Sequence, residues 1–202
     1  MTKHFDNAAV NWDMGDARQN IASGVFKTLI SRISLLNNMK IMDFGAGTGL
    51  LSFKIAPLVH SVVGVDLSAK MLEQLSVKNS EAVKVLPLCQ DILMDPLDER
   101  FHGIVSSMAM HHVEDTNLLF KTFYEHLKKD GFIAIADLEA EDGTFHSHGN
   151  EGVYHFGFDR DALREKITKA GFSHVRFHHA HTIEKEIGSY PIFLVTAVKE
   201  NG

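Results

Sequence analysis

The sequence of 202 residues has a single cysteine, Cys89, and no long hydrophobic run. One cysteine cannot close an internal disulfide, and zinc sites usually recruit several thiolates, so we expect a protein of the reducing cytoplasm. No segment approaches the roughly 18 to 20 apolar residues of a membrane-spanning helix. The N-terminal residues MTKHFDNAAV have no apolar run either, so we expect neither a secretory signal nor a membrane partner.

Stretches of lysine and arginine are also missing, and the net charge is −6. We expect no nucleic-acid partner, because such partners are held by clustered basic side chains. Repeats, low-complexity segments and Pro/Gly/Ser-rich linkers are absent from the sequence as well, and its length suits one domain with a sizeable core. We therefore expect a single domain over residues 1–202 that exists as a monomer or homodimer.

Short β-like runs alternate with helical runs along most of the chain, after an irregular segment at residues 1–16. The β-like runs are residues 40–44, 61–66, 83–88, 103–107, 132–137, 174–178 and 192–198. The helical runs are residues 17–36, 50–58, 69–78, 117–128 and 160–170. Strands that alternate with helices require crossover connections, so we predict an α/β fold with a mainly parallel sheet of these strands.

Two local features refine the predicted sheet. Pro87 lies in the third β-like run, and proline is tolerated there only if the strand is at an edge of the sheet. The break at residues 188–191 has no room for a helix, so the last two strands should be antiparallel neighbours joined by a short loop. We therefore predict one antiparallel strand in an otherwise parallel sheet.

A glycine-rich turn follows the first β-like run. Residues 42–51 read MDFGAGTGLL, so Gly45, Gly47 and Gly49 stand between a strand and a helix. Glycine lets a ligand approach the backbone closely, and the helix N-terminus offers free N–H groups. An ordinary strand-to-helix turn is the alternative. The nicotinamide fingerprint is G-x-G-x-x-G, whereas here the third glycine comes one residue early, which favours an amino-acid-like group over a pyrophosphate.

A carboxylate ends the second β-like run. Asp66 stands 19 residues beyond Gly47, within SVVGVDLSAKML. A carboxylate at this place can accept two hydrogen bonds from a ribose diol. The alternative is that Asp66 only belongs to the helix cap that Ser68 is expected to form.

Four segments follow one another in a recognisable order: MDFGAGTGLL, VVGVDLSAKML, LCQDI and FHGIVSSMAMHHVED. With them the chain resembles the class I S-adenosylmethionine-dependent methyltransferases over about residues 17–198. The resemblance implies a Rossmann-like three-layer sandwich with strand order 3-2-1-4-5-7-6, and S-adenosyl-L-methionine as cofactor. We divide the chain into four parts: an N-terminal arm and helix at 1–36, a cofactor-binding half at 37–138, a lid-like insertion at 139–158, and a C-terminal helix and hairpin at 159–202.

The resemblance also implies roles for the residues of the first two segments. Gly45, Gly47 and Gly49 would pack against the methionine part of the cofactor. Asp43 would orient the turn and the cofactor's ammonium group through water. Asp66 would hold the ribose hydroxyls.

Later strand ends would complete the cofactor site. By the same resemblance, Leu67 would lie against the adenine, Asp91 would accept from the adenine amino group, and Ile92 would flank the ring. Ser107 and Met108, at the end of the fourth β-like run, would line the methionyl end.

The double histidine provides candidate catalytic residues. Methyl transfer from a sulfonium is an in-line displacement that demands alignment and exclusion of water, and it needs a base only if the nucleophile must lose a proton. His111 and His112 follow the fourth β-like run, where the methyl group should point, and histidine suits proton transfer near neutral pH. The alternative is a structural role at the start of the next helix.

Residues 139–158 have no clear periodicity, and a stretch of this length in a compact domain is often a functional lid. Their candidate acceptor-binding side chains are Phe145, His146, His148, Tyr154 and His155. Trp12 is a candidate acceptor contact as well, because it could close the other side of the site together with Phe5 and the first helix. A packed surface loop is the alternative for the insertion.

Metal binding by this insertion is the less favoured hypothesis. His146 and His148 would present two imidazoles on one face of an extended chain, near several carboxylates in the sequence. Because acidic runs are usually solvated loops, we expect no metal ion.

Absent motifs limit the acceptor. The sequence has no Asn/Asp-Pro-Pro-aromatic motif, no Pro-Cys pair and no appended RNA-binding module, which argues against nucleic-acid bases. We predict methyl transfer from S-adenosylmethionine to a small-molecule acceptor. The alternatives left open are a non-catalytic S-adenosylmethionine-binding protein, a methyltransferase acting on a protein or RNA, and a nicotinamide-dependent oxidoreductase.

Overall fold

The structure is a computed structural model, and it describes residues 2–146 and 149–200. Its strands are β1 (Lys40–Phe44), β2 (Ser61–Asp66), β3 (Val85–Cys89), β4 (Phe101–Ser107), β5 (Leu127–Leu138), β6 (Ser173–Lys185) and β7 (Gly188–Val198). Its helices are α1 (Thr2–Ala8), α2 (Asp16–Arg32), α3 (Ser52–Ile55), α4 (Ala69–Val77), α5 (Thr116–His126) and α6 (Arg160–Lys169). Short 3-10 turns are η1 (Ala9–Asn11), η2 (Ala56–Leu58) and η3 (Met110–His112).

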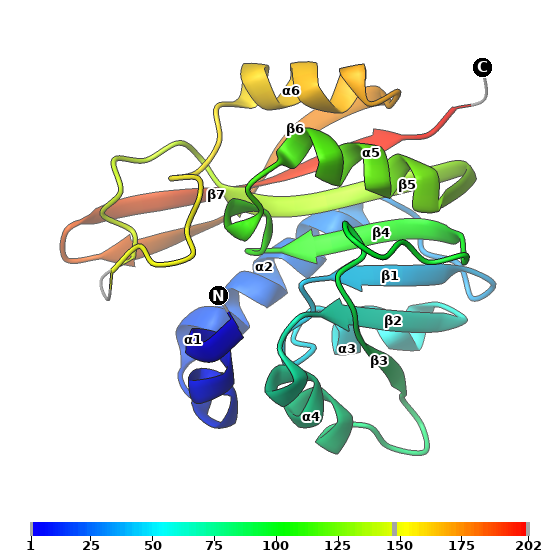
Figure 1. The fold of residues 1–202 in the computed structure, drawn as a ribbon, viewed down its shortest axis with the longest axis horizontal. Coiled ribbons are helices and arrows are strands. Elements are labelled where there is room, and N and C mark those ends of the chain that lie inside the picture. The colour runs from blue at the N-terminus through cyan, green and yellow to red at the C-terminus, as the bar shows by residue number, and fades with distance from the viewer. Residues whose placement is uncertain (1, 147–148, 201–202) are drawn as a thin grey trace.

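The strands form a seven-stranded sheet in the order β3-β2-β1-β4-β5-β7-β6 (Figure 1). Strands β1 to β5 pair in parallel, whereas β7 runs antiparallel to both β5 and β6. The predicted α/β class, strand order and single antiparallel strand are confirmed. Because the carboxyl ends of parallel strands lie at one edge of a sheet, the turns after β1, β2 and β4 meet there.

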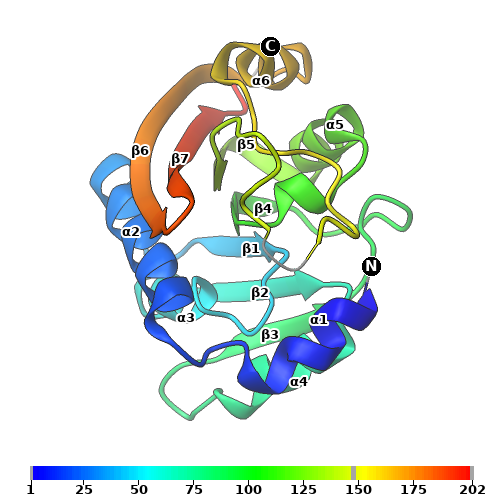
Figure 2. The ribbon, with the colours of Figure 1, turned by 90° about the vertical axis from the view of Figure 1, so that its left-hand side faces the viewer.

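Helices cover both faces of the sheet, as the alternation of buried residues in the strands requires. In β1, Ile41 belongs to the core cluster formed with α2, α3 and α4, whereas its neighbour Met42 belongs to the cluster formed with α5 and α6. Both side chains are fully buried, because successive strand residues point to opposite faces. Figure 2 shows α2 and α3 on one side of the sheet and α5 and α6 on the other. The predicted three-layer sandwich is therefore present.

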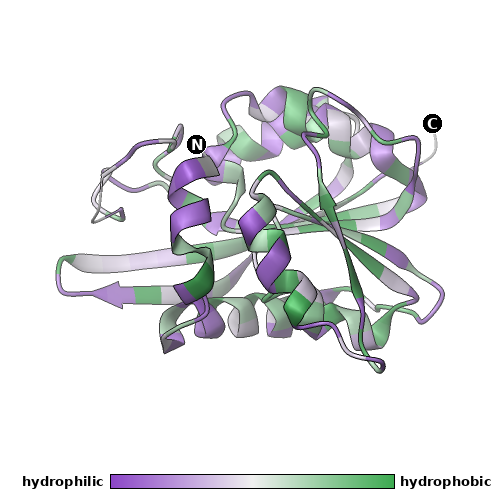
Figure 3. Ribbon diagram, turned by 60° about the horizontal axis from the view of Figure 1, so that its bottom comes forward, coloured by the Kyte–Doolittle hydropathy of each residue, from purple (hydrophilic) through white to green (hydrophobic). Residues whose placement is uncertain are grey.

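The strands at both edges of the sheet have the predicted arrangement, but the hairpin at one edge is longer than predicted. Strand β3 lies at an edge, where Pro87 stands opposite Gly64 of β2, so the edge prediction is confirmed. At the other end, β6 and β7 form the predicted antiparallel pair, but their ladder continues to Lys185 opposite Gly188. β5 pairs with β7 only as far as Ile192, so the hairpin projects beyond the sheet (Figure 1). The projecting end is mostly pale in Figure 3, with one hydrophilic and one hydrophobic stretch, so it lacks the continuous hydrophobic run that indicates a buried strand.

The N-terminal segment differs from the prediction, because α1 and η1 occupy part of the stretch expected to be irregular. A seven-residue helix is not stable alone, so contacts with the rest of the chain must hold it. Ser68 Oγ donates to Asp6 Oδ1 at 2.6 Å, and Thr48 Oγ1 donates to Asp13 Oδ1 at 2.5 Å. These partners are 62 and 35 residues apart in sequence, so no local pattern reveals them. None of the helices within the described ranges has the length and apolar character needed to cross a bilayer.

Candidate functional site

The turn between β1 and α3 has a backbone that favours glycine. Gly45 and Gly47 have φ values of +66° and +55°, which L side chains rarely adopt. A Cβ on Gly45 would lie 2.3 Å from the Cβ of Ala109, whereas a Cβ on Gly47 would meet nothing nearer than Nε1 of Trp12 at 4.0 Å. Gly45 thus allows the turn to pack against the segment after β4, and Gly47 leaves open space beside the turn.

A cavity of about 420 Å³ borders the carboxyl ends of β1, β2 and β4. Most of the residues predicted to bind the cofactor line it: Gly45, Gly47, Asp66, Leu67, Asp91, Ile92, Ser107 and Met108. Asp43 and Gly49 do not, and Gly49 packs instead against the ring of Phe53. Cavities for small organic ligands measure about 300–1,000 Å³, so this one has a suitable size.

Asp66 connects the end of β2 to the glycine turn. Its Oδ2 accepts a hydrogen bond from N of Gly47 at 2.8 Å, and its Oδ1 accepts one from N of Ser68 at 2.8 Å. Burial raises the pKa of Asp66 above its ordinary value. Ser68, as predicted, caps α4 by accepting from N of Met71. Each carboxylate oxygen has a second lone pair, so Asp66 can still accept hydrogen bonds from a diol in the cavity.

Asp43 lies behind the glycine turn, where it is buried and away from the cavity. Ser52 Oγ, at the first residue of α3, donates to Asp43 Oδ2 at 2.5 Å. Burial, and to a smaller extent the charge of Asp66, raises the pKa of Asp43 to about 7. Asp43 therefore ties β1 to α3 and positions the turn from behind. Its predicted action on the cofactor's ammonium group stays a prediction.

The wall formed after β4 contains a strained residue. Met108 has a φ of +58° although it is not a glycine, and its N donates to O of Ala136 at 2.9 Å. Such a conformation costs about 1–3 kcal/mol and clusters at ligand sites and switches, although Asp130 and His174, away from the cavity, share it here. Met108 also lines the cavity, so the strain lies at the predicted methionyl end.

The N-terminal segment closes the cavity from the outside. Phe5 and Trp12 both line it, and their rings meet edge to face with centroids 5.7 Å apart. The Phe5 ring also meets the His112 ring at 5.1 Å, and Arg18 lies 3.9 Å from the centre of the Trp12 ring. This aromatic wall excludes water from one side of the cavity.

The two candidate catalytic histidines, both in η3, have different surroundings. His112 lines the cavity, whereas His111 is buried behind it with Asp137. The Nδ1 atom of His112 is 2.7 Å from O of Gly152. Burial, followed by the charge of His111, lowers the pKa of His112 to about 4. His112 is therefore neutral near pH 7 and is a hydrogen-bond acceptor more than a strong base.

The insertion after β5 is fastened to the rest of the molecule at both ends. N of Tyr154 and N of His155 both donate to O of His111, at 3.0 and 3.2 Å. The Phe145 ring packs edge to face on Tyr190 of β7, with centroids 5.2 Å apart. These contacts pack Phe145 and the backbone at Tyr154 and His155 against the rest of the molecule.

The candidate acceptor residues of this insertion do not all reach the cavity. Tyr154 lines it and is 51% exposed, whereas Phe145, His146 and His155 do not line it. His155 is hydrogen-bonded through Nε2 to O of Val113 at 3.0 Å, and burial lowers the pKa of His146. His148 lies outside the described residues. An acceptor role for each of these side chains stays a prediction.

Sequence reasoning did not single out Glu114 and Asp115, which also line the cavity. Both belong to the segment FHGIVSSMAMHHVED and follow η3 closely. Their place shortly after the end of β4 is the feature of the sequence that could have indicated a position at the cavity. Asp115 Oδ1 accepts from N of Asn117 and N of Leu118, at 2.9 and 3.0 Å, and so caps α5. Glu114 is the more available of the two carboxylates for a ligand.

Comparison with known proteins agrees with this geometry. The model of a family described as "Methyltransferase domain" matches residues 41–131. An uncharacterized methyltransferase of Schizosaccharomyces pombe is 30% identical over 154 residues, which are 68% of this chain and 54% of that protein. The chain belongs to the class I S-adenosylmethionine-dependent methyltransferases. It spans about half the length of the curated relatives it matches first.

Two solved structures extend the comparison of the methyltransferase fold. The putative methyltransferase in a complex with the Trm112 methyltransferase activator of Haloferax volcanii has a TM-score of 0.79 and 18% identity, and the match covers 98% of both chains. Magnesium protoporphyrin IX methyltransferase from Synechocystis, with bound S-adenosylmethionine, has a TM-score of 0.68 and 17% identity, covering 91% of this chain and 80% of that one. At these identities the likeness shows the fold alone.

Proposed function

We propose that this methyltransferase transfers the methyl group of S-adenosylmethionine to a small-molecule acceptor that enters beside Trp12, His112 and Tyr154. The observation that carries the proposal is a single cavity lined both by most of the residues predicted for the cofactor and by these three side chains. Donor and acceptor held in one enclosed space can be aligned for in-line displacement, which is the main demand of methyl transfer.

The residues at one end of the cavity fit the cofactor. Gly47 leaves room where a side chain would otherwise stand, and its N–H, together with that of Ser68, fixes Asp66 at the mouth of this space. Asp66 can accept from the two ribose hydroxyls, and the exposed apolar surface of Leu67 suits a flat ring. The bound cofactor supplies an electrophilic methyl group on a sulfonium.

The residues at the other end suit a neutral or weakly acidic nucleophile. The Phe5 and Trp12 rings exclude water from the acceptor. The Nδ1 atom of His112 donates to O of Gly152, so the opposite nitrogen carries the lone pair. That lone pair can accept a hydrogen bond from an acceptor O–H or N–H and so orient the attacking atom. With its low pKa, His112 positions the acceptor more than it removes a proton.

A transfer assay separates a small-molecule methyltransferase from a non-catalytic S-adenosylmethionine-binding protein and from a methyltransferase that acts on protein. Purified protein is incubated with S-adenosylmethionine labelled in its methyl group and with a panel of small hydroxyl, amine, thiol and carboxylate acceptors. We expect label in an acceptor and release of S-adenosylhomocysteine. Binding of the cofactor without transfer to any acceptor, including the proteins of an extract, would favour a non-catalytic role. Label found only in protein would show that the acceptor is a protein and not a small molecule.

Oligomeric state and acceptor class belong to the same proposal. We infer a chain that acts as a monomer or homodimer, with a small-molecule acceptor and no nucleic-acid partner. The acceptor class is supported by the size of the cavity, about 420 Å³, and the absence of a nucleic-acid partner by the net charge of −6.

A further inference from the structure

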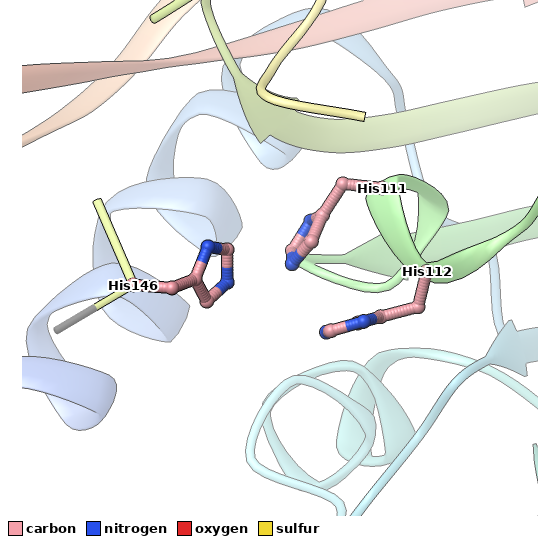
Figure 4. Close-up of side chains that lie close together, drawn as sticks. All are labelled: His111, His112 and His146. Carbon is pink, nitrogen blue, oxygen red and sulfur yellow. The ribbon is translucent and has the colours of Figure 1, made fainter. Parts of the chain in front are cut away.

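Three imidazoles from two distant segments converge beside the acceptor end of the cavity. His111 and His112 come from η3, and His146 comes from the insertion after β5. One ring nitrogen of each lies within 4.8 Å of the other two. Figure 4 shows the three rings facing a common space. The sequence gives no sign of this cluster, because the loop path brings His146 to the double histidine.

The His111 ring is held by a buried carboxylate. Its Nδ1 is 2.7 Å from Oδ1 of Asp137. The same carboxylate accepts hydrogen bonds from N of Leu138 at 2.8 Å and N of His111 at 3.1 Å, so it acts as an acceptor throughout. Nδ1 of His111 therefore donates to this carboxylate, which leaves Nε2 as the atom of this ring that can serve as a metal ligand. Carboxylates orient metal-binding histidines in this way.

The His112 ring is held in the same tautomer by a backbone carbonyl. A carbonyl oxygen only accepts hydrogen bonds, so the 2.7 Å contact with O of Gly152 places the proton on Nδ1 of His112. Nε2 then carries the lone pair here as well. Two adjacent imidazoles thus offer lone pairs from side chains fixed by their opposite nitrogens, as metal ligands require.

His146 carries one of the two buried polar side-chain atoms that lack a hydrogen-bond partner among the described residues. These atoms are Nδ1 of His146 and Oε1 of Glu141. The charge of Glu141 acts on the His146 ring, and its other oxygen is fixed by three backbone N–H groups of the insertion. Nδ1 of His146 and Oε1 of Glu141 are not hydrogen-bonded to each other in this structure, so Glu141 would orient His146 only after one of the two side chains moves toward the other.

We propose that His111, His112 and His146 bind a divalent transition-metal ion of the zinc type, with Nε2 of His111 and His112 as ligands. Three histidines leave a fourth position open in catalytic zinc sites, and metal–nitrogen distances of about 2.0–2.1 Å place the nitrogens about 3.3 Å apart. His146 must move inward to reach this spacing, and it is the half-buried ring that no side-chain hydrogen bond among the described residues fixes.

A role of this metal site in methyl transfer rests on the proposed function, because His112 also lines the cavity in which transfer is proposed. With the ion bound, the Nε2 lone pair of His112 is used by the metal, and the open metal position would take over from it in orienting an oxygen or nitrogen of the acceptor. The proposal departs from the expectation from sequence that no metal ion is bound, since that expectation considered only histidines within the insertion.

Metal-free protein tests the proposal directly. The full chain is treated with chelator, dialysed, and titrated with Zn²⁺ by calorimetry and with Co²⁺ by visible absorption. We expect one ion per chain and Co²⁺ bands of a low-coordinate nitrogen site. His146→Ala should weaken Zn²⁺ binding at least about tenfold, and Glu141→Gln should weaken it about 10- to 100-fold through the loss of its support. The control His60→Ala, an exposed histidine outside the cluster, should bind like wild type.

Two outcomes would overturn the proposal: no stoichiometric Zn²⁺ binding by the wild-type chain, or equal binding by wild type and His146→Ala. Circular dichroism on the same samples checks that each variant is folded. S-adenosylhomocysteine is titrated in parallel, with and without Zn²⁺. If S-adenosylhomocysteine binds while Zn²⁺ does not, the metal inference fails alone; if S-adenosylhomocysteine does not bind, the proposed function fails.

Discussion

The two ends of the cavity are constructed from different parts of the chain. The donor end consists of a glycine turn and a carboxylate on neighbouring strands, β1 and β2, joined by the hydrogen bond from Gly47 to Asp66. The acceptor end consists of side chains from the N-terminal segment, η3 and the insertion after β5, represented by Phe5, His112 and Tyr154, with Trp12 reaching from this side toward Gly47. The sheet fixes the first end, whereas packing between distant segments fixes the second. Substitutions at the two ends should therefore have separable effects.

The largest expected effect concerns Asp43 behind the donor end. Its pKa is about 7 in the folded chain, so the folded state binds the proton more tightly than the unfolded chain. The free energy of unfolding should therefore fall as pH rises from about 4 to about 7, by on the order of 4 kcal/mol from this group. Asp43→Asn should remove that part of the decline and be the more stable protein at pH 8. Urea titrations at several pH values measure it, and parallel curves for the two proteins would contradict it.

The glycine turn offers a matched pair of substitutions. Gly45→Ala places a Cβ 2.3 Å from the Ala109 Cβ in a conformation with positive φ, so it should lower the free energy of unfolding by about 3 kcal/mol. Gly47→Ala meets no such contact and should lower it by only about 1 kcal/mol, while weakening S-adenosylhomocysteine binding. Thermal unfolding and calorimetry separate the two effects. Equal loss of stability in both variants would refute the distinction.

Asp66 tests the carboxylate of the donor end. Asp66→Ala should weaken S-adenosylhomocysteine binding several-fold to about a hundredfold, because charge-assisted hydrogen bonds contribute about 1.5–3 kcal/mol. Calorimetric titration measures the change. Unchanged affinity in a folded variant would place the ribose elsewhere.

The smallest expected effect concerns the acceptor end. Tyr154→Ala should impair transfer to the acceptor and leave S-adenosylhomocysteine affinity and melting temperature near wild type, because the side chain is exposed and lines the cavity. Phe145→Ala should instead lower stability by about 1 kcal/mol, because its ring packs on Tyr190. If Tyr154→Ala melts early, or transfers methyl groups normally, Tyr154 does not act at the acceptor.

Local sequence patterns predicted the donor end because its contacts are local to neighbouring strands. The apolar runs of β1 and β2 predict the bounds that the structure shows, and Pro87 predicts the edge position of β3. The strand ends then follow from topology, which brings Asp66 to Gly47. Even there, sequence could not separate Asp43, which lies behind the turn, from the residues that line the cavity.

The acceptor end was less predictable because long-range packing decides it. Helix α1 is too short to show a hydrophobic periodicity in the sequence, and the outer half of β6 lacks the apolar alternation of a buried strand. The insertion after β5 brings His146 beside His111, with ring centroids 5.2 Å apart, although the two are far apart in sequence. No periodicity or motif encodes such a meeting, since it depends on the path of an irregular segment.

A crystal structure with S-adenosylhomocysteine tests the central claim most directly, namely that one cavity joins the methyl donor to the acceptor end. The account predicts the homocysteine part beside Gly47, the ribose hydroxyls on Asp66, and the sulfur directed toward His112. A ligand bound outside this cavity, or one whose ribose does not contact Asp66, would contradict it.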